Sequence, residues 1–384
     1  MGMQNDPCSS HLSDAFGGID DPRRDHTKRH ELLDILLIGI CCLLCGGRGF
    51  VDMEEFGHSK FDWLRTFLAL PQGIPSHDTF RRVFGLIDPH QFADCFGRWT
   101  QRLRQAVSAE VVALDGKTVR RSFDRAAGRG PIHLVSAWAA TNRLVLGQLQ
   151  TDDKSNEITA VPELLRTLEL AGCIVTVDAL NCQKDIAKEI SEADADYVMT
   201  LKANHGTAYA EVKTFLEDAQ RRHFAGVAHD FVETLDKDHG RLERRGYWIT
   251  DQIDWFADRP QWEKLRTVAL VQAEREIGGQ RSVERRVFLC SLPPDARLLE
   301  RAVRGHWGIE NQLHWVLDVQ LDEDQCRVRV GHAAQNLATL RRIVLNLLRQ
   351  ETSSRRGIKG KQLKASWDHA YLQSLLNPKR SSDA

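Results

Sequence analysis

The spacing of hydrophobic residues changes several times along this chain. From Arg29 to about Val107, apolar residues recur three or four positions apart, which is typical of amphipathic helices. At about residue 108 the pattern changes to short β-rich runs, AEVVALDGKTV, IHLVSAWAAT and RLVLGQLQT, separated by polar or glycine-containing breaks. The pattern therefore predicts a helical N-terminal part followed by three sequential antiparallel strands.

Helices and strands then alternate in the order of a known architecture. A helical run EITAVPELLRTLEL precedes the strand CIVTVDA, and a second helical run CQKDIAKEISEA precedes the strand DYVMTLKA. Residues 205 to 295 return to alternating strands, and the helical pattern resumes at about Leu298. We therefore predict an α/β protein: an RNase H-like mixed sheet flanked by helices, with an N-terminal helical domain and a β-rich insertion.

The same pattern divides the chain into five parts. The final part contains SSRRGIKGKQLK, which is basic and glycine-containing, so we expect a mobile tail suited to contact phosphate. The parts are an N-terminal helical domain (1–107), the first part of the core (108–204), the β-rich insertion (205–297), the second part of the core (298–350) and the basic C-terminal tail (351–384).

Composition narrows the class of protein. The 384 residues are 42% hydrophobic and 27% charged, which is ordinary for a soluble globular protein. The longest apolar run, LLDILLIGICCLLCGG, contains Asp34 and is too short to span a bilayer, so we expect no membrane partner. No signal-peptide pattern opens the chain and the nine cysteines are an odd number, so we expect reduced thiols and a cytoplasmic location.

Two further observations argue against a zinc or redox site and against a nucleotide cofactor. Cys42 and Cys45 form a C-x-x-C pair inside the apolar run, where packing is expected in preference to a zinc or redox site because no second pair exists. The chain has no G-x-x-x-x-G-K-[ST] loop, so no nucleotide cofactor is expected.

Three carboxylates are the candidates for chemistry. Asp115 ends the apolar run VVALD and Asp178 ends CIVTVD, and a rigid strand end that meets solvent is a usual place for a site. If residues 303–317 are helical, Glu310 shares the apolar stripe with His306 and His314. Each has an alternative explanation: an Asp that caps a turn, or a Glu paired with a neighbouring Arg or His.

Together, the three carboxylates suggest metal-dependent chemistry. Carboxylates brought close together repel one another, so a cluster at neutral pH implies divalent cations between them. Oxygen ligands favour Mg²⁺ or Mn²⁺, and two such ions can activate a water or a 3′-hydroxyl at a phosphodiester. Asp115, Asp178 and Glu310 are therefore predicted as catalytic residues and metal ligands.

Several long segments resemble one family of proteins. HELLDILLIGICCLLCG, PSHDTFRRVF, ALDGKTVRRS, TVDALNCQKDIA, DYVMTLKANH, HWGIENQLHWVLDVQLDED and NLATLRRIVLNLLR occur in the order found in the H-repeat-associated transposases of bacterial insertion sequences, a branch of the DDE transposases with an RNase H-like core. The resemblance implies a catalytic triad of Asp115, Asp178 and Glu310. It also implies binding of the double-stranded terminal inverted repeats, metal-dependent cleavage and strand transfer, and a homodimer on paired DNA ends.

The chain departs from the wider group around Glu310. The Tyr, Arg, Glu and Lys of that group fall here on Val303, His306, Glu310 and Leu317, so only the Glu is kept, and His306 is the candidate to replace the Arg. The residues predicted to contact DNA are Lys117, Arg120, Arg121, Lys202, Arg304, His306, Asn311 and His314.

Two rival functions follow from the same residues. One is a catalytically inactive or repurposed DNA-binding protein derived from such a transposase. The other is a metallohydrolase with a zinc ion held by His306, Glu310 and His314, which predicts tightly bound zinc. The short helix after Ser76, which carries Arg81 and Arg82, fits either the second helix of a helix-turn-helix or one more helix of a bundle.

Overall fold

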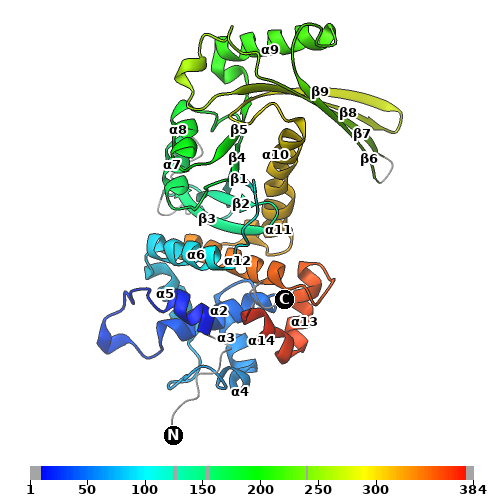
Figure 1. The fold of residues 1–384 in the computed structure, drawn as a ribbon. Coiled ribbons are helices and arrows are strands. Elements are labelled where there is room, and N and C mark those ends of the chain that lie inside the picture. The colour runs from blue at the N-terminus through cyan, green and yellow to red at the C-terminus, as the bar shows by residue number, and fades with distance from the viewer. Residues whose placement is uncertain (1–9, 124–127, 152–155, 239–240, 378–384) are drawn as a thin grey trace.

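The computed structural model describes residues 10–123, 128–151, 156–238 and 241–377. Figure 1 shows a helical body, built from both ends of the chain, beneath a large sheet that carries further helices. The elements of the helical body are α1 (Ser10–Phe16), η1 (Asp25–Thr27), α2 (Leu32–Leu44), α3 (Phe50–Ser59), α4 (Phe61–Leu64), α5 (His77–Leu86), α6 (Pro89–Leu103), α12 (Ala333–Gln350), α13 (Ile358–Trp367) and α14 (His369–Leu376).

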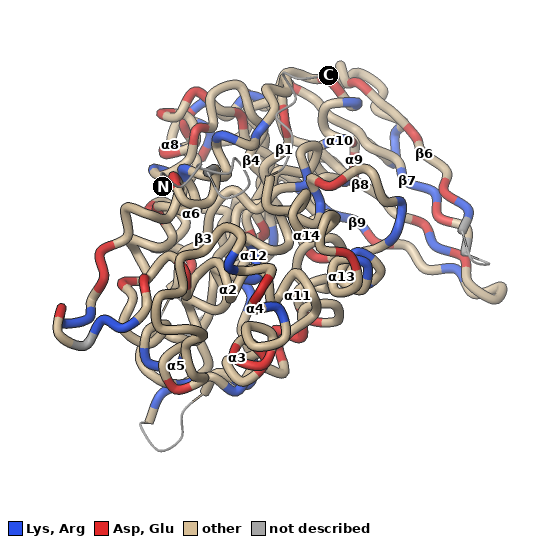
Figure 2. Tube along the Cα trace, turned by 90° about the horizontal axis from the view of Figure 1, so that it is seen from below, with Lys and Arg blue, Asp and Glu red and all other residues tan. Residues whose placement is uncertain are grey.

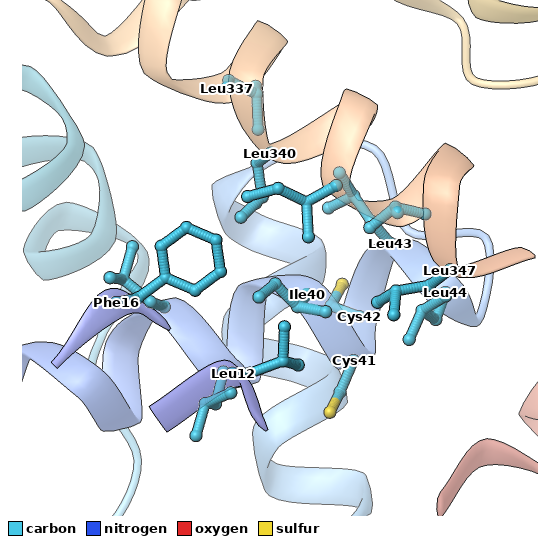
Figure 3. Packing of buried hydrophobic residues seen from close by; sticks show 14 of the residues in the cluster. Leu12, Phe16, Ile40, Cys41, Cys42, Leu43, Leu44, Leu337, Leu340 and Leu347 are labelled. Atoms are coloured by element: carbon cyan, nitrogen blue, oxygen red, sulfur yellow. The ribbon is translucent and has the colours of Figure 1, made fainter. Parts of the chain in front are cut away.

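Two apolar helices form the centre of this body. Helix α2 contains the longest apolar run of the chain, and nearly all of its side chains are buried. Figure 3 shows its Ile40 and Leu43 among side chains of α12, including Leu340 and Leu347. Cys42 is free and buried, and burial raises the pKa of its thiol well above the ordinary value. The C-x-x-C segment is therefore part of the hydrophobic core, as its apolar surroundings predicted.

Helix α5 begins where the sequence predicted. The Ser76 hydroxyl accepts a hydrogen bond from the main-chain N–H of Thr79 and caps the helix. Asn336 of α12 donates to the carbonyl groups of Phe84 and Ile87 at the other end of α5. Helix α5 is therefore capped at its first turn and attached to α12 at its other end.

The C-terminal segment is ordered, and the expectation of a mobile tail was wrong for residues 358–376. Helices α13 and α14 pack on the helical body through apolar side chains such as Ala365 and Leu372. Lys361 donates to the carbonyl of Leu348 over 2.8 Å, and Gln362 donates to the carbonyl of Leu43 over 2.8 Å. The basic composition of this segment suggested exposure to solvent. Lys361 is instead buried, because its ammonium group donates to carbonyl groups at the end of α12.

The sheet contains nine strands in the order β3-β2-β1-β4-β5-β9-β8-β7-β6. Strands β1, β2 and β3 pair antiparallel, whereas β4 and β5 run parallel to β1. This order confirms the predicted RNase H-like mixed sheet flanked by helices. The strands of this half are β1 (Val111–Thr118), β2 (His133–Ala139), β3 (Leu144–Thr151), β4 (Ile174–Val177) and β5 (Asp196–Leu201).

The strands of the insertion extend the same sheet. Strand β9 pairs antiparallel with β5. Strands β8 and β9 form one long hairpin, β6 and β7 form another, and β7 pairs with β8. The strands are β6 (Asp230–Asp238), β7 (Arg241–Thr250), β8 (Thr267–Ile277) and β9 (Gln280–Cys290). The insertion opens on a helix, α9 (Gly206–Arg221), which corrects the expectation of strands throughout. Its buried Ala208, Val212 and Leu216 are four residues apart, a helical spacing.

Helices cover both faces of the sheet. Helices α7, α8 and α9 pack against one face, and α10 packs against the other (Figure 1). Because side chains alternate along a strand, Asp115 and Lys117 of β1 point to the α10 face and Gly116 and Thr118 to the α7 face. The remaining elements are α7 (Glu157–Arg166), α8 (Lys184–Glu192), η3 (Ala203–His205), η4 (Arg259–Gln261), α10 (Ala296–Gly308), the π-helix η5 (Ile309–His314), α11 (Trp315–Val319) and η6 (Glu323–Gln325).

The long hairpins carry both signs of charge. Figure 2 shows basic and acidic positions interleaved along β6 to β9. Several form cross-strand ion pairs, among them Arg244 with Glu233 and Arg275 with Glu243. In the part of the chain that the structure describes, no helix combines the length and the hydrophobicity needed to cross a bilayer.

Candidate active site

The three predicted carboxylates line one cavity. Asp115 lies on β1, Asp178 directly follows β4, and Glu310 lies on the π-helix η5, and all three border a cavity of about 370 Å³. The strand register explains the first pair, because Leu114 is paired with Val177 in parallel. Asp115 and Asp178 therefore occupy the next position of two neighbouring strands. Strand β1 continues to Thr118, so Asp115 lies within its strand and not at its end as the sequence suggested.

The helix that carries Glu310 is not a regular α-helix. Helix α10 ends at Gly308, the π-helix η5 follows, and α11 begins at Trp315, whereas the sequence predicted a continuous α-helix over residues 303–317. Single π-helical turns within α-helices frequently occur at functional sites. The wider turn still directs the three expected residues to the sheet: Glu310 to the cavity, His306 to Thr176 of β4 and His314 to Asp115.

Both histidines of this helix are neutral at pH 7. Burial lowers the pKa of His306 to about 4, and its Nδ1 lies 2.9 Å from the Thr176 hydroxyl. Burial also lowers the pKa of His314 to about 3, and its Nδ1 lies 3.4 Å from an Asp115 oxygen. A neutral His306 cannot supply the positive charge of an arginine, so it is a poor replacement for that residue at a phosphate.

The carboxylates form a crowded anionic site. Burial raises the pKa of Asp115 to about 7, and the negative charges of Asp178, Glu157 and Glu310 add to this effect. Within the described residues, no three His, Cys, Asp or Glu side chains are already arranged to hold a metal ion. The all-oxygen donor set and the mutual repulsion nevertheless fit a hard divalent cation such as Mg²⁺ or Mn²⁺, whose charge would relieve that repulsion.

Glu157 lies behind the cavity and contacts its surroundings through Asn181, although the sequence pattern did not single it out. It is buried at the start of α7, and its Oε1 lies 2.7 Å from Nε2 of His133. Asn181 donates to Glu157 over 3.0 Å and to Asp178 over 3.1 Å. A signal was present, because Glu157 falls on the apolar stripe of α7 with Ala160 and Val161. The same kind of signal had indicated Glu310.

Gly116 leaves room for this buried pair. A Cβ atom at this position would lie 2.4 Å from Oε1 of Glu157 and 2.5 Å from Nε2 of His133. We expect Gly116→Ala to lower the free energy of unfolding by about 1–3 kcal/mol, since both neighbours are buried and cannot move into solvent. Urea unfolding measures this change. Gly130→Ala is the control because its Cβ meets no atom within 4 Å, and equal losses in both variants would contradict the packing argument.

The residues predicted to contact DNA differ in exposure and in their partners. Lys117 is buried and paired with Asp318 over 2.6 Å, with Glu323 and with Asp324, so its charge is used within the protein. Arg304 is paired with Asp236. Lys202 is exposed and lines the cavity. The remaining residues Arg120, Arg121 and Asn311 are exposed.

A cationic wall of the cavity was not predicted from the sequence. Arg286 of β9 lines it together with Trp307 of α10. The Trp307 ring is surrounded by the guanidinium groups of Arg245, Arg275 and Arg286, whose centres lie 4.8, 5.8 and 5.1 Å from the ring centroid. No local pattern predicts this contact, because the arginines come from three strands of the insertion.

Comparisons with known proteins identify the family. Residues 107–347 match the model of the transposase DDE domain, and residues 13–100 match the model of the region associated with it. The chain is 38% identical to "H repeat-associated putative transposase YhhI" of Escherichia coli K12, over 93% of this chain and 95% of that one. It is 46% identical to "Uncharacterized protein in dhlA 3'region" of Xanthobacter autotrophicus, over 73% of this chain and 94% of that one.

A solved structure was also found. It is a piggyBac transposase synaptic complex with hairpin DNA, with a TM-score of 0.43 and 12% identity, covering 97% of this chain and 78% of that one. The family models and the curated relatives carry the assignment, and they agree with the sheet order and with the cavity that collects the three carboxylates. The chain belongs to the DDE transposases, in the H-repeat-associated family of insertion-sequence transposases.

Proposed function

We propose that this protein binds the terminal inverted repeats of its insertion sequence, cleaves the DNA there and joins the freed 3′-hydroxyl ends to target DNA. The observation that carries the proposal is the cavity bordered by Asp115, Asp178 and Glu310. These three residues would hold the divalent ions, Mg²⁺ or Mn²⁺. When bound, the ions supply the activation of the attacking hydroxyl and the stabilisation of the leaving oxygen that phosphodiester chemistry needs.

The protein groups around the cavity have roles of their own. Lys202 and Arg286 bring positive charge to its wall, although Arg286 also pairs with Glu284 over 2.7 Å, and both are suited to bind the phosphates next to the cleaved bond. Trp307 and Val303 form an apolar border that limits access of water. Asp178 is fixed by the main-chain N–H groups of Leu180 and Asn181, which donate to its Oδ1.

DNA outside the cavity needs further contacts. The exposed Arg120, Arg121 and Asn311 lie on segments next to the catalytic strand or helix and are proposed to contact the DNA backbone. Arg304 joins them if it leaves Asp236. Because the described residues of one chain gather one set of these three carboxylates and two element ends have to be cut, we propose that a homodimer acts on paired ends.

Cleavage of labelled DNA that carries the sequences flanking this gene tests the proposal. The wild type is expected to nick at the element ends with Mg²⁺ or Mn²⁺ and to be inactive in EDTA. Asp178→Asn and Glu310→Gln are expected to lower the rate by on the order of 10⁴ while gel-shift affinity for the same DNA is kept. Glu300→Gln on the neighbouring helix α10 is the matched control and should cleave as the wild type does.

The rival functions give different results. A repurposed DNA-binding protein binds the element ends but does not cleave them with either metal. A zinc hydrolase retains stoichiometric zinc through purification, which elemental analysis detects. Either result would overturn the proposed function.

A further inference from the structure

A buried chain of hydrogen bonds lies behind the catalytic strand, on the face opposite Asp115. The Thr118 hydroxyl lies 2.8 Å from Nδ1 of His133, and Nε2 of His133 lies 2.7 Å from Oε1 of Glu157. The amide of Asn181 donates to Oε2 of Glu157 over 3.0 Å and to Oδ1 of Asp178 over 3.1 Å. The chain therefore connects β1, β2 and α7 with the loop that follows β4.

The chemistry of these groups sets the direction of the bonds to Glu157. An ionised carboxylate only accepts, so His133 donates from Nε2, and a neutral imidazole then accepts at Nδ1 from the Thr118 hydroxyl. Both hydrogens of the Asn181 amide are used, one for Glu157 and one for Asp178. Asn181 is 0% exposed and Glu157 is 2% exposed, so water does not compete for these bonds.

The network acts on two of the three carboxylates. Oδ1 of Asp178 accepts from the Asn181 amide as well as from two main-chain N–H groups, so this carboxylate has little freedom to rotate. The charge of Glu157 also adds to the negative field at Asp115, from the far side of β1. Gly116 stands between them without a side chain, and this absence lets Glu157 and His133 pack against the strand.

We infer that Glu157 is a positioning residue for the carboxylate site: through Asn181 it fixes Asp178, and its charge strengthens the attraction of the site for a divalent cation. This inference rests on the proposed function and deepens it. Glu157 does not line the cavity that collects Asp115, Asp178 and Glu310. It acts through Asn181, as the outer partners of metal ligands do.

Two variants separate the charge of Glu157 from the geometry of the network. Glu157→Gln removes the charge but keeps the bonds, because Gln accepts from Asn181 and donates to His133 once the imidazole changes tautomer. Asn181→Ala removes the link to Asp178. The matched controls are Glu163→Gln and Gln183→Ala. Glu163 is an exposed acid on α7, and the Gln183 amide donates to the Leu180 carbonyl in the same loop.

Binding of Mn²⁺ to the DNA-free protein, followed by electron paramagnetic resonance, is the first readout. Asp178→Asn defines the signal that belongs to the site. Glu157→Gln and Asn181→Ala are expected to weaken Mn²⁺ binding by about tenfold, while the two controls bind as the wild type does. The Mg²⁺ concentration for half-maximal cleavage should rise in parallel, with unchanged gel-shift affinity for the element ends. Thermal melting checks that each variant is folded.

The outcomes distinguish this inference from the proposed function. If both variants are folded and bind Mn²⁺ as the wild type does, the network has only a structural role and the inference is overturned. The same holds if the wild type shows no Mn²⁺ signal that Asp178→Asn removes. If the wild type does not cleave DNA but Glu157→Gln still weakens Mn²⁺ binding tenfold, the proposed function fails and the positioning role stands.

Discussion

Asp115→Asn is expected to abolish DNA cleavage and, at the same time, to make the metal-free protein more stable. The side chain keeps its shape but loses the charge that Mg²⁺ needs, so the cleavage rate should fall by on the order of 10⁴. Stability should move in the opposite direction. Asp115 is crowded by Asp178, Glu157 and Glu310, and removing one of four negative charges relieves repulsion in the folded state.

The pH dependence of stability gives the sign of this effect. The pKa of Asp115 is about 7 in the folded protein and 3.8 for an ordinary Asp, so between these values the folded state binds the proton more strongly. The contribution of Asp115 to the free energy of unfolding is therefore unfavourable at pH 8, and this penalty shrinks as the pH falls from about 7 toward 3.8. A tenfold difference in proton affinity between the folded and unfolded states corresponds to about 1.4 kcal/mol, so the expected gain in stability at pH 8 is on the order of a few kcal/mol.

Urea unfolding in EDTA at pH 8 measures the gain, and the same experiment at pH 5 is its control. At pH 5 Asp115 is protonated in the folded wild type but still ionised in the unfolded chain, so the advantage of the variant should be clearly smaller than at pH 8 and should nearly disappear only as the pH reaches 3.8. Added Mg²⁺ should stabilise the wild type more than the variant, because it binds the folded site. A variant less stable than the wild type at pH 8 would contradict the crowding of the carboxylates.

The second large effect is expected from Arg342→Met, which should lower the free energy of unfolding by about 3–5 kcal/mol. Arg342 and Glu323 are both fully buried and lie 2.7 Å apart, and Lys117 of β1 pairs with the same Glu323. Burial favours the protonated form of Glu323, but the charges of Arg342 and Lys117 outweigh it and hold the pKa at about 2. Without Arg342, a buried carboxylate loses its closest partner.

Arg341→Met is the matched control for this variant. Arg341 is the preceding residue of α12 and is equally buried, but it donates to the carbonyl groups of Leu321 and Arg48 over 3.3 and 3.4 Å. Urea unfolding should show a clearly smaller loss of stability for Arg341→Met than for Arg342→Met. Because the pKa of Glu323 is lowered on folding, the wild-type advantage over Arg342→Met is present above about pH 4.5 and shrinks as the pH falls toward 2. Equal losses in the two variants would argue against the ion pair.

The part of the fold that depends on local pattern was predictable from the sequence. The runs VVALD and CIVTVD are apolar, as buried strands are, and were predicted as strands. The order of strand and helix patterns along the chain then indicated the RNase H-like sheet. The cap at Ser76 was predictable for the same reason, since its partner Thr79 is three residues away. Helix α9 was also within reach, and was missed because its stripe of Ala208 and Val212 is short and only weakly apolar.

Features that depend on distant residues were not predictable in this way. Lys117 was predicted to contact DNA, but it is paired with Asp318 and Asp324, which lie about 200 residues further along the chain. The π-helix at Glu310 leaves no trace in the spacing of apolar residues, because its neighbours fit an α-helix equally well. The link from Glu157 to Asp178 required the register of β1 and β4, which sequence spacing alone does not give.

The continuity of the nine-stranded sheet has a mechanical consequence. Strands β8 and β9 have eleven residues each, a length of about 36 Å, and main-chain pairing joins β9 to β5 antiparallel, as it joins β5 to β4 in parallel. The hairpin is therefore a continuous extension of the sheet that carries Asp115. A tilt of a few degrees at β5 becomes a displacement of several ångströms at the tip. The position of the hairpin tip relative to Asp115 and Asp178 therefore depends on the pairing of β5 with β9.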